Sequence, residues 1–339
     1  MIYIELRMGE NVMNLFKHKG PAIGIDLGSA NILVYARNKG VVVKEPSIMA
    51  VDAETEKIVA VGEAAKKMQG RTHAGIKVIQ PIRGGVVADF NAASELVQHH
   101  VKELSSNGVV SRKPLIVIST PTHLTSVERR AVKDTALQAG AKEAVVVEDI
   151  FAAAIGAGLP VWDATGSMIV DIGAGTTEVA IISLGGIVVS NSIKIAGDEM
   201  DRLILKHVKA VHRLLIGDTT AEQIKIHIFT EEQHGKMEIR GRDLVTGLPR
   251  TIEITAKEIE EVLIETFEQI TMVIVQTLEL TPPELAADII DRGLLLSGGV
   301  SLLPNLVNIL SEATHLPVFL SDNPLENVVM GTAKLIEQH

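Results

Sequence analysis

Two aspartates occupy matched positions in a long-range repeat, each just before a glycine-containing turn. Asp26 lies in IGIDLGSANILVYARNKG (23–40) and Asp171 in the similar IVDIGAGTTEVAIISLGG, and one constant offset aligns Asp26 with Asp171 and Gly28 with Gly173. Turns that present several backbone N–H groups bind anions, and two carboxylates beside phosphates need a divalent cation to offset their charge. The pair predicts a phosphate site shared by two turns, with Mg²⁺ held through water by Asp26 and Asp171. The alternative is two ordinary hairpins whose aspartates bond turn amides.

Each copy of the repeat is expected to fold as a β-hairpin that a third strand continues. Apolar, β-branched residues lead into each aspartate, and a second β-rich run follows the turn at once. The third strands would lie at 41–44 and 187–189. A Rossmann fingerprint requires a helix to begin at its glycines and a P-loop requires GxxxxGK[ST], and the sequence offers neither. The glycines therefore indicate a different kind of phosphate site.

A third glycine-rich element follows near the C-terminus, in DRGLLLSGGVSLLPNLVNIL. A buried strand is expected to end at Ser297, and Gly298 and Gly299 would allow close backbone approach. A helix would then begin with Pro304 near its first turn. Such a corner can receive an adenine ring and a ribose, although a purely structural strand–helix turn is the common alternative.

The remaining segments predict an α/β protein with a mixed sheet in each half. Apolar residues spaced by three and four predict helices at 92–104, 126–139, 198–215, 256–280 and 301–313. Short strands are expected between them at 115–119, 144–147 and 294–297. Strand signals and a TGLP turn within 231–255 predict a small subdomain on the second half.

Length and composition exclude several classes of protein. The chain has 339 residues, enough for about two domains, and its 46% hydrophobic content is aliphatic, with 3% aromatic residues. The net charge of −10 argues against nucleic-acid binding. The absence of cysteine excludes a disulfide scaffold, a thiolate metal site and a cysteine nucleophile, and suits a reducing cytoplasm. The histidines, including His99 and His100, show no ligand spacing paired with carboxylates.

The high mean hydropathy of +0.27 raises the question of a membrane. The most apolar stretch, 167–189, is interrupted by Asp171 and Glu178, so no transmembrane helix is expected. The segment 1–19 lacks the apolar run of a signal peptide. Its apolar residues share one helical face, which predicts an interfacial amphipathic membrane helix. A mobile tail, or residues upstream of a true start at Met8 or Met13, is the equally open alternative.

The two hairpins and the GG corner, in this order, resemble the actin/Hsp70/sugar-kinase ATPase superfamily. Within it, 20–339 resembles the bacterial actin group MreB/Mbl, through strings such as GIDLGSAN, PIRGGVVADF, AAAIGAGLP, DIGAGTTEVAIISLGG and RGRDLVTGLP. The resemblance implies an actin-like ATPase fold of two duplicated RNase H-like domains with a nucleotide cleft between them. Domain I would span 20–160, with 328–339 returning to it, and domain II 161–327, with a small subdomain at about 197–257.

The resemblance also implies roles for residues at matching positions. Glu148 would orient the attacking water with help from Thr176, although a helix-cap acid is the alternative for Glu148. The implied nucleotide-binding residues are those of the first turn (Gly28, Ser29, Ala30, Asn31), the second turn (Gly173, Ala174, Gly175, Thr176), the AEQIK segment (Glu222, Gln223, Ile224, Lys225) and the GG corner (Gly298, Gly299, Val300, Ser301, Leu302).

Three departures from the family pattern bear on hydrolysis. The usual EEP reads Glu148-Asp149-Ile150, Ala174 stands for a glycine of the second turn, and Val300 replaces a glycine of the corner. A methyl group at Ala174 is expected to crowd the γ-phosphate, and the lost proline to loosen the helix entry. Nucleotide binding is expected to survive, with a weak ATPase as a polymerisation switch.

The function implied by the resemblance is that of an ATP- and Mg²⁺-dependent bacterial actin homologue that forms filaments. Such a protein organises cell-wall elongation and rod shape at the inner face of the cell membrane, with itself and membrane proteins of cell-wall elongation as partners. The alternatives are a non-polymerising actin-like adaptor, a small-molecule kinase and an Hsp70-like chaperone. The kinase would need a substrate domain and the chaperone a peptide-binding domain, and little unassigned chain remains for either.

A loop is expected to provide weak membrane contact. The matching loop, SSNGVVSRKP, offers Val109 and Val110 beside Arg112 and Lys113. Burying two valine side chains gives roughly 3–5 kcal/mol before ordering costs. Lipid binding is therefore expected to depend on polymerisation, because a filament sums many weak contacts.

Overall fold

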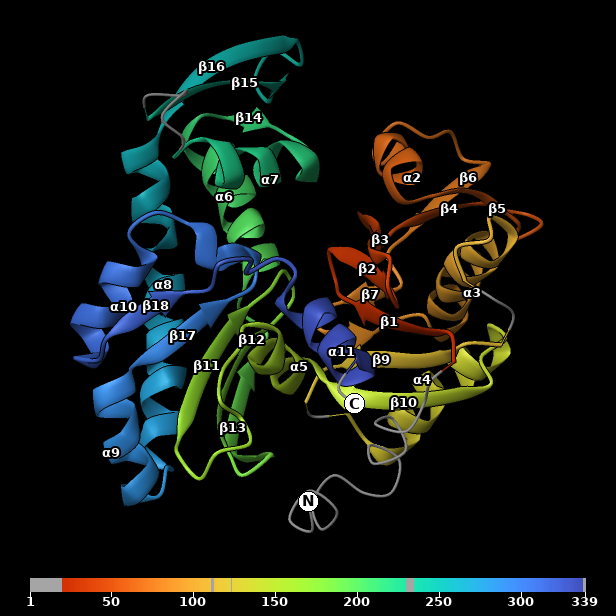
Figure 1. The fold of residues 1–339 in the computed structure, drawn as a ribbon. Helices are drawn as coiled ribbons and strands as arrows, with labels where there is room; N and C mark the ends of the chain where they lie inside the picture. The colour runs from red at the N-terminus through yellow and green to blue at the C-terminus, as the bar shows by residue number, and fades with distance from the viewer. Residues whose placement is uncertain (1–19, 111–112, 123, 230–234, 338–339) are drawn as a thin grey trace.

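The computed structural model describes residues 20–110, 113–122, 124–229 and 235–337. Two five-stranded sheets dominate it and stand beside each other (Figure 1). The first sheet has the order β10-β9-β1-β2-β3, with β1 (Ala22–Leu27), β2 (Asn31–Ala36), β3 (Gly40–Pro46), β9 (Leu115–Thr120) and β10 (Glu143–Glu148). The second has the order β13-β12-β11-β17-β18, with β11 (Ser167–Ile172), β12 (Thr177–Ser183), β13 (Gly186–Ile193), β17 (Leu294–Ser297) and β18 (Val318–Leu320).

The two sheets have the same topology, which confirms that the repeat in the sequence reflects a duplicated unit. In each sheet the repeat forms a three-stranded antiparallel meander, β1-β2-β3 or β11-β12-β13. In each, the first strand of the repeat pairs in parallel on its other edge, β1 with β9 and β11 with β17. Asp26 pairs with Leu33 and Asp171 with Glu178, so both aspartates occupy the same position in their hairpins.

Helices cover the sheets and fill the space between them (Figure 1). The described helices are α2 (Gly62–Met68), α3 (Phe90–Ser106), α4 (Ser126–Gln138), α5 (Asp149–Gly156), α6 (Gly197–Val211), α7 (Asp218–His227), α8 (Ala256–Glu279), α9 (Pro283–Arg292), α10 (Leu306–Thr314) and α11 (Asn327–Glu337). The helices expected at 92–104, 126–139 and 256–280 correspond to α3, α4 and α8 within two residues at each end.

Two of the expected helices have different bounds. The helix expected at 198–215 ends at Val211, because Leu214–Leu215 leaves it to pair as β14 with β15. The helix expected at 301–313 begins at Leu306, because Asn305 has a left-handed backbone (φ 64). A 3₁₀ turn, Gly299–Leu302, occupies the space before it.

Each half carries a smaller sheet at the top of Figure 1. On the first half it contains β4 (Met49–Asp52), β5 (Ile58–Val61) and β6 (Ile76–Ile79), beside α2. On the second half it contains β14, β15 (Lys236–Asp243) and β16 (Pro249–Thr255), beside α7. The strand signals within 231–255 are thus β15 and β16. A further short hairpin consists of β7 (Ile82–Arg83) and β8 (Val86–Val87).

Helices α5 and α11 cross in close contact between the two halves (Figure 1). A Cβ atom built on Gly331 would lie 1.8 Å from the carbonyl oxygen of Ala152, and one on Gly156 would lie 1.8 Å from that of Asn327. The Lys334 ammonium donates to the carbonyl oxygen of Ile155 at 3.0 Å. Because α11 also packs on β1 and β2, the C-terminal segment contacts the first sheet. The domain boundaries at 160 and 328 stay predictions.

None of the helices in the described part of the chain is both long and apolar enough to cross a bilayer. The amphipathic helix expected at 1–19 lies outside the described residues. The expectation for the loop at Val109 and Val110 is wrong for Val110. Its side chain is 7% exposed within the core of the first half, and Val109 packs against that core. The backbone N–H groups of both valines donate to the Leu104 carbonyl oxygen near the end of α3.

His100 on α3 makes stability sensitive to acid. It is 2% exposed, its Nε2 has no hydrogen-bond partner, and burial lowers its pKa to about 4 from 6.5. The unfolded chain takes up a proton on His100 near pH 6.5, whereas the folded state does so only near pH 4. The contribution of His100 to the free energy of unfolding is therefore fully present above pH 6.5. It falls by about 3 kcal/mol in total as the pH is lowered from 6.5 to 4. In urea titrations across this range, we expect His100→Leu to lose less stability than the wild type. Equal losses would contradict the assignment.

Candidate functional site

A cavity of about 710 Å³ lies between the two halves, and both hairpins of the repeat line it. Most residues expected to bind nucleotide meet there. They are Asp26, Gly28, Ser29, Ala30, Asn31, Asp171, Gly173, Ala174, Gly175, Thr176, Glu222, Lys225, Gly298, Gly299, Val300 and Leu302. Segments from across the chain therefore line one cavity.

The two hairpin turns have the same internal bond and lie close to each other. The Gly28 amide donates to the Asn31 carbonyl oxygen at 3.1 Å, and the Gly173 amide donates to that of Thr176 at 3.0 Å. A Cβ atom on Gly175 would lie 2.6 Å from Ser29 Oγ, so only glycine permits this approach. Backbone N–H groups thus converge from two sides, which is the arrangement expected for an anion.

Buried carboxylates line the floor of the cavity between the turns. Burial raises the pKa of Asp26 to about 7, and the charge of Asp171 adds to this effect. Burial likewise raises the pKa of Asp149 and of Asp171. The Oδ1 atoms of Asp149 and Asp171 are buried without a hydrogen-bond partner. A hard divalent cation such as Mg²⁺ fits this set, since it would offset the repulsion and occupy the unpartnered oxygens.

The GG corner brings its backbone close to the second hairpin. Gly298 has φ 84, and a Cβ atom there would lie 2.3 Å from the carbonyl oxygen of Ile172 on β11. Ser301 does not line the cavity, because its side chain is buried and donates to the Gly298 carbonyl oxygen at 2.6 Å. Ser301 therefore holds the corner in shape.

One face of α7 borders the cavity. Glu222 and Lys225 lie one turn apart on it. Gln223 and Ile224 do not line the cavity, since helical geometry turns Gln223 to solvent and buries Ile224 in the core of the second half. The Lys225 ammonium pairs with Asp201 at 2.9 Å and donates to the Gly197 carbonyl oxygen at 2.9 Å.

A salt bridge joins the two halves beside the cavity. The Lys66 ammonium on α2 lies 2.8 Å from the Glu222 carboxylate on α7. Both side chains are about a third exposed, so solvent screens the pair. A second contact between the halves lies at Thr122, whose hydroxyl donates to Glu178 Oε2 at 2.8 Å.

The structure does not bring Glu148 to the cavity. Its side chain points toward Arg129, which donates to Glu148 Oε1 at 2.9 Å, and about a third of it is exposed. Glu148 does precede α5, but its side chain makes no cap hydrogen bond. The next residue, Asp149, faces the cavity instead. Glu148 is the last residue of β10 and Asp149 is the first residue of α5, so the two carboxylates leave the chain in different directions where the strand changes to the helix.

Sequence reasoning missed several apolar residues of the cavity wall. Ile226, Phe229, Leu303 and Leu325 line it. Ile226 and Phe229 follow Glu222 by four and seven positions, and this spacing was a signal for a common helical face. The apolar wall suits a flat aromatic ring, whereas the turns and carboxylates suit phosphates and a cation.

Comparison with known proteins agrees with this geometry. The MreB/Mbl protein family model matches residues 20–339. The cell shape-determining protein Mbl of Bacillus subtilis is 46% identical over 318 residues, which cover 93% of this chain and 95% of Mbl. The cell shape-determining protein MreB of Escherichia coli is 44% identical over 322 residues, 93% of each chain.

Solved structures give the same result. MreB5 of Spiroplasma citri bound to ADP superposes with a TM-score of 0.89 at 38% identity, covering 94% of this chain and 97% of MreB5. The same protein bound to AMPPNP gives a TM-score of 0.87, covering 95% and 97%. The fold is thus the actin-like fold, with a mixed sheet in each half as expected. This chain belongs to the MreB/Mbl family of bacterial actin homologues.

Proposed function

We propose that this chain is an ATP-binding, slowly hydrolysing bacterial actin homologue that assembles into filaments and acts in determining cell shape. The observation that carries the proposal is the cavity enclosed by two equivalent hairpins, with buried carboxylates on its floor. Relatives in the family are named for cell shape determination, and a relative of the same fold binds ADP and AMPPNP.

The phosphates would lie between the turns at Ser29–Asn31 and Gly173–Thr176, where backbone N–H groups are available. Asp26 and Asp171 would hold Mg²⁺ through water, and the ion supplies charge neutralisation at the phosphates. Asp149, whose Oδ1 is buried, is the cavity carboxylate that we assign to orienting the attacking water, with Thr176 beside the same space. Phosphoryl transfer depends chiefly on such positioning and charge stabilisation.

Nucleotide bound in this cavity would contact both halves, so its state would bias the angle between them. Several contacts between the halves would have to adjust in such a rotation. Those described above include the α5–α11 crossing, the close approach of Gly175 to Ser29, the contact of Thr122 with Glu178, and the salt bridge of Lys66 with Glu222. Since Glu222 also borders the cavity, a ribose hydroxyl and Lys66 would compete for its carboxylate.

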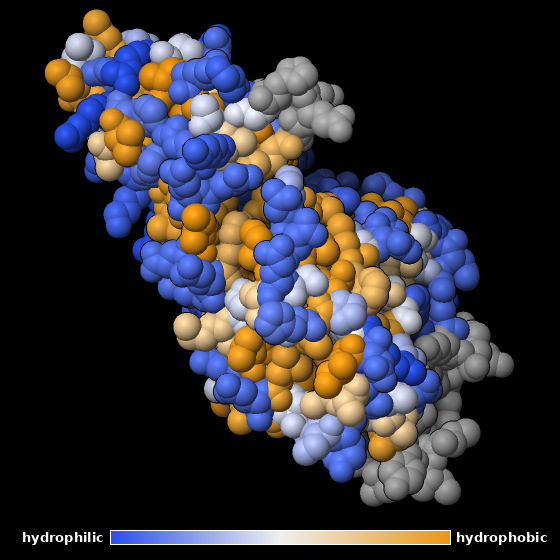
Figure 2. All heavy atoms as spheres, turned by 90° about the vertical axis from the view of Figure 1, so that its left-hand side faces the viewer, coloured by the Kyte–Doolittle hydropathy of each residue, from blue (hydrophilic) through white to orange (hydrophobic). Residues whose placement is uncertain are grey.

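Self-association requires a surface that a second copy can cover. Figure 2 shows apolar side chains over the face of the second half that carries α8, α9 and α10. Ile264 and Met272 on α8 and Ile290 on α9 are each more than half exposed. Apolar surface of this kind is typical of protein contacts. Contacts that repeat head to tail form a filament when the rotation between successive copies does not close a ring.

The test is sedimentation of the full chain with Mg²⁺ and ATP, followed by electron microscopy of the pellet. We expect filaments with ATP or AMPPNP and a larger soluble fraction with ADP. A matched variant, Gly175→Val, should prevent assembly because its side chain would clash with Ser29 and Gly85. Persistent monomers at high concentration with ATP, also in the presence of lipid vesicles, would contradict the proposal.

A further inference from the structure

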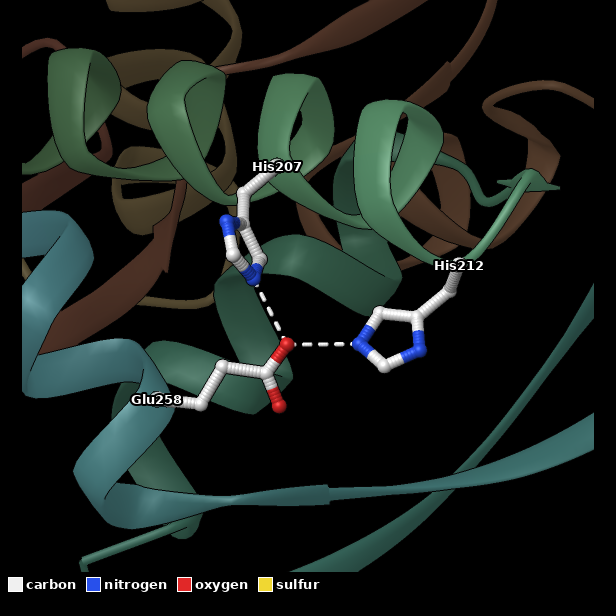
Figure 3. Close-up of side chains that lie close together, drawn as sticks. All are labelled: His207, His212 and Glu258. Carbon is white, nitrogen blue, oxygen red and sulfur yellow. Dashed lines mark hydrogen bonds and ion pairs between the residues drawn. The ribbon is translucent and has the colours of Figure 1, made fainter.

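Three ligating side chains converge outside the nucleotide cavity, in the second half of the molecule (Figure 3). His207 lies on α6, His212 directly follows α6, and Glu258 lies in the first turn of α8. The His207 Nε2 is 2.6 Å and the His212 Nε2 is 2.5 Å from the same oxygen, Glu258 Oε1. Glu258 is 46 residues from His212 in the sequence, so local spacing could not indicate this group.

We propose that His207, His212 and Glu258 form a binding site for a divalent transition-metal ion of the zinc class. Two imidazoles and one carboxylate are a ligand set that Zn²⁺ takes in proteins, and a water or another ligand completes four-coordination. Mg²⁺ and Ca²⁺ prefer oxygen ligands, which sets this site apart from the carboxylates of the nucleotide cavity.

The geometry needs a small adjustment to accept the ion. The three ligand atoms already lie within 4.8 Å of one another. Ligands of tetrahedral Zn²⁺ at about 2.0–2.1 Å from the metal are separated by about 3.3 Å. Each imidazole nitrogen therefore has to move away from Glu258 Oε1 by less than about 1 Å. All three side chains are just under a quarter exposed, so an ion can enter from solvent.

Metal binding would replace the hydrogen bonds of the cluster. In the metal-free state the Nε2 atoms of His207 and His212 each share a hydrogen bond with Glu258 Oε1. An imidazole binds a metal ion through a nitrogen that carries no proton, so a proton on Nε2 would move to Nδ1 or to solvent when the ion binds. The change from hydrogen bond to metal bond needs no other reactant.

The position of the cluster gives the ion a structural role. The chain enters the small subdomain directly after His212, at β14, and leaves it through β16, directly before α8. His212 and Glu258 thus stand at the entry and the exit of the segment that carries α7. A bound ion would link the entry of this segment at His212 to its exit at Glu258. It would thereby fix the positions of Glu222 and Lys225 on α7 relative to the cavity.

The site is separate from the nucleotide cavity. Gly197 at the start of α6 lines the cavity, whereas His212 caps its other end. The 15 residues of α6 span about 22 Å. Substitution of the histidines should therefore leave the nucleotide's own contacts in place.

The test begins with the full-length protein stripped of metal with a chelator. Zn²⁺ binding is followed by isothermal titration with millimolar Mg²⁺ present, and Co²⁺ binding by visible absorption. We expect one Zn²⁺ per chain that Mg²⁺ does not displace, the intense absorption of four-coordinate Co²⁺, and a higher melting temperature with Zn²⁺. The proposal would be overturned if the wild-type protein did not bind Zn²⁺ stoichiometrically. His207 and His212 would then only form hydrogen bonds with Glu258.

Variants assign the binding to these residues. Loss of a direct ligand should weaken Zn²⁺ binding by about a hundredfold or more in His207→Ala, His212→Ala and Glu258→Gln, since loss of outer partners alone costs 10–100-fold. The matched control is His99→Ala, which removes a histidine paired with a single glutamate, Glu103, at 3.8 Å. Equal loss in the control, or full binding in His207→Ala and His212→Ala, would contradict the assignment. The Co²⁺ spectrum is measured on the wild-type protein. It therefore tests for a four-coordinate metal site even if one of the variants folds poorly.

Discussion

Replacing Asp149 with asparagine is expected to slow ATP-dependent phosphate release by about a hundredfold or more, while nucleotide still binds. The substitution keeps the size of the side chain and removes the charge that would orient the attacking water. Asp149 lines the cavity, and its buried Oδ1 has no hydrogen-bond partner. The measurements are phosphate release in a single turnover and the affinity for a fluorescent ATP analogue.

Glu148→Gln is the matched control, because it makes the same chemical change one residue earlier. Glu148 pairs with Arg129 outside the cavity, so phosphate release should stay at the wild-type rate. The family resemblance suggested the opposite assignment. If Glu148→Gln released phosphate slowly and Asp149→Asn released it at the wild-type rate, Glu148 would be the residue that orients the attacking water.

The second large effect is expected at the crossing of α5 and α11. Gly331→Ala should lower the free energy of unfolding by about 3 kcal/mol, because its Cβ atom would lie 1.8 Å from the Ala152 carbonyl oxygen. Helix propensity alone predicts the opposite sign, since alanine within a helix is favoured over glycine by about 0.5–1 kcal/mol. Urea unfolding followed by circular dichroism measures the difference.

Gly217→Ala serves as the control for Gly331→Ala. Gly217 precedes α7, and a Cβ atom there would meet nothing within 4 Å. Gly217→Ala should lower the free energy of unfolding by less than about 1 kcal/mol, which is in the usual range for substitutions at a helix N-cap. If Gly331→Ala proved as stable as the wild type, the close contact between α5 and α11 would be refuted. The crossing could not then be the tight joint between the halves.

The sequence predicted the fold well where a pattern repeats. The matched hairpins at Asp26 and Asp171 indicated a duplicated α/β architecture. The two sheets have equivalent strand orders, β3-β2-β1-β9-β10 and β13-β12-β11-β17-β18. The periodic helices α3, α4 and α8 were also predicted closely. Boundaries differed where tertiary contacts override local propensity, as at Leu214–Leu215, which leave α6 to pair with β15.

The site was predicted less completely, because side-chain direction depends on register and on distant partners. A one-residue difference at the end of β10 sends Glu148 to Arg129 and Asp149 into the cavity. Burial of Val110 in the first core removed an expected lipid contact. The convergence of His207, His212 and Glu258 depends on where α6 ends relative to α8, which no local pattern encodes.

The central claim is that one nucleotide binds between the two matched hairpins and thereby links both halves. The most direct test is a structure of the protein with AMPPNP and Mg²⁺. It should show the phosphates between Ser29–Asn31 and Gly173–Thr176, with the cation near Asp26 and Asp171. Nucleotide bound elsewhere, or contacting the residues of one hairpin alone, would contradict the claim.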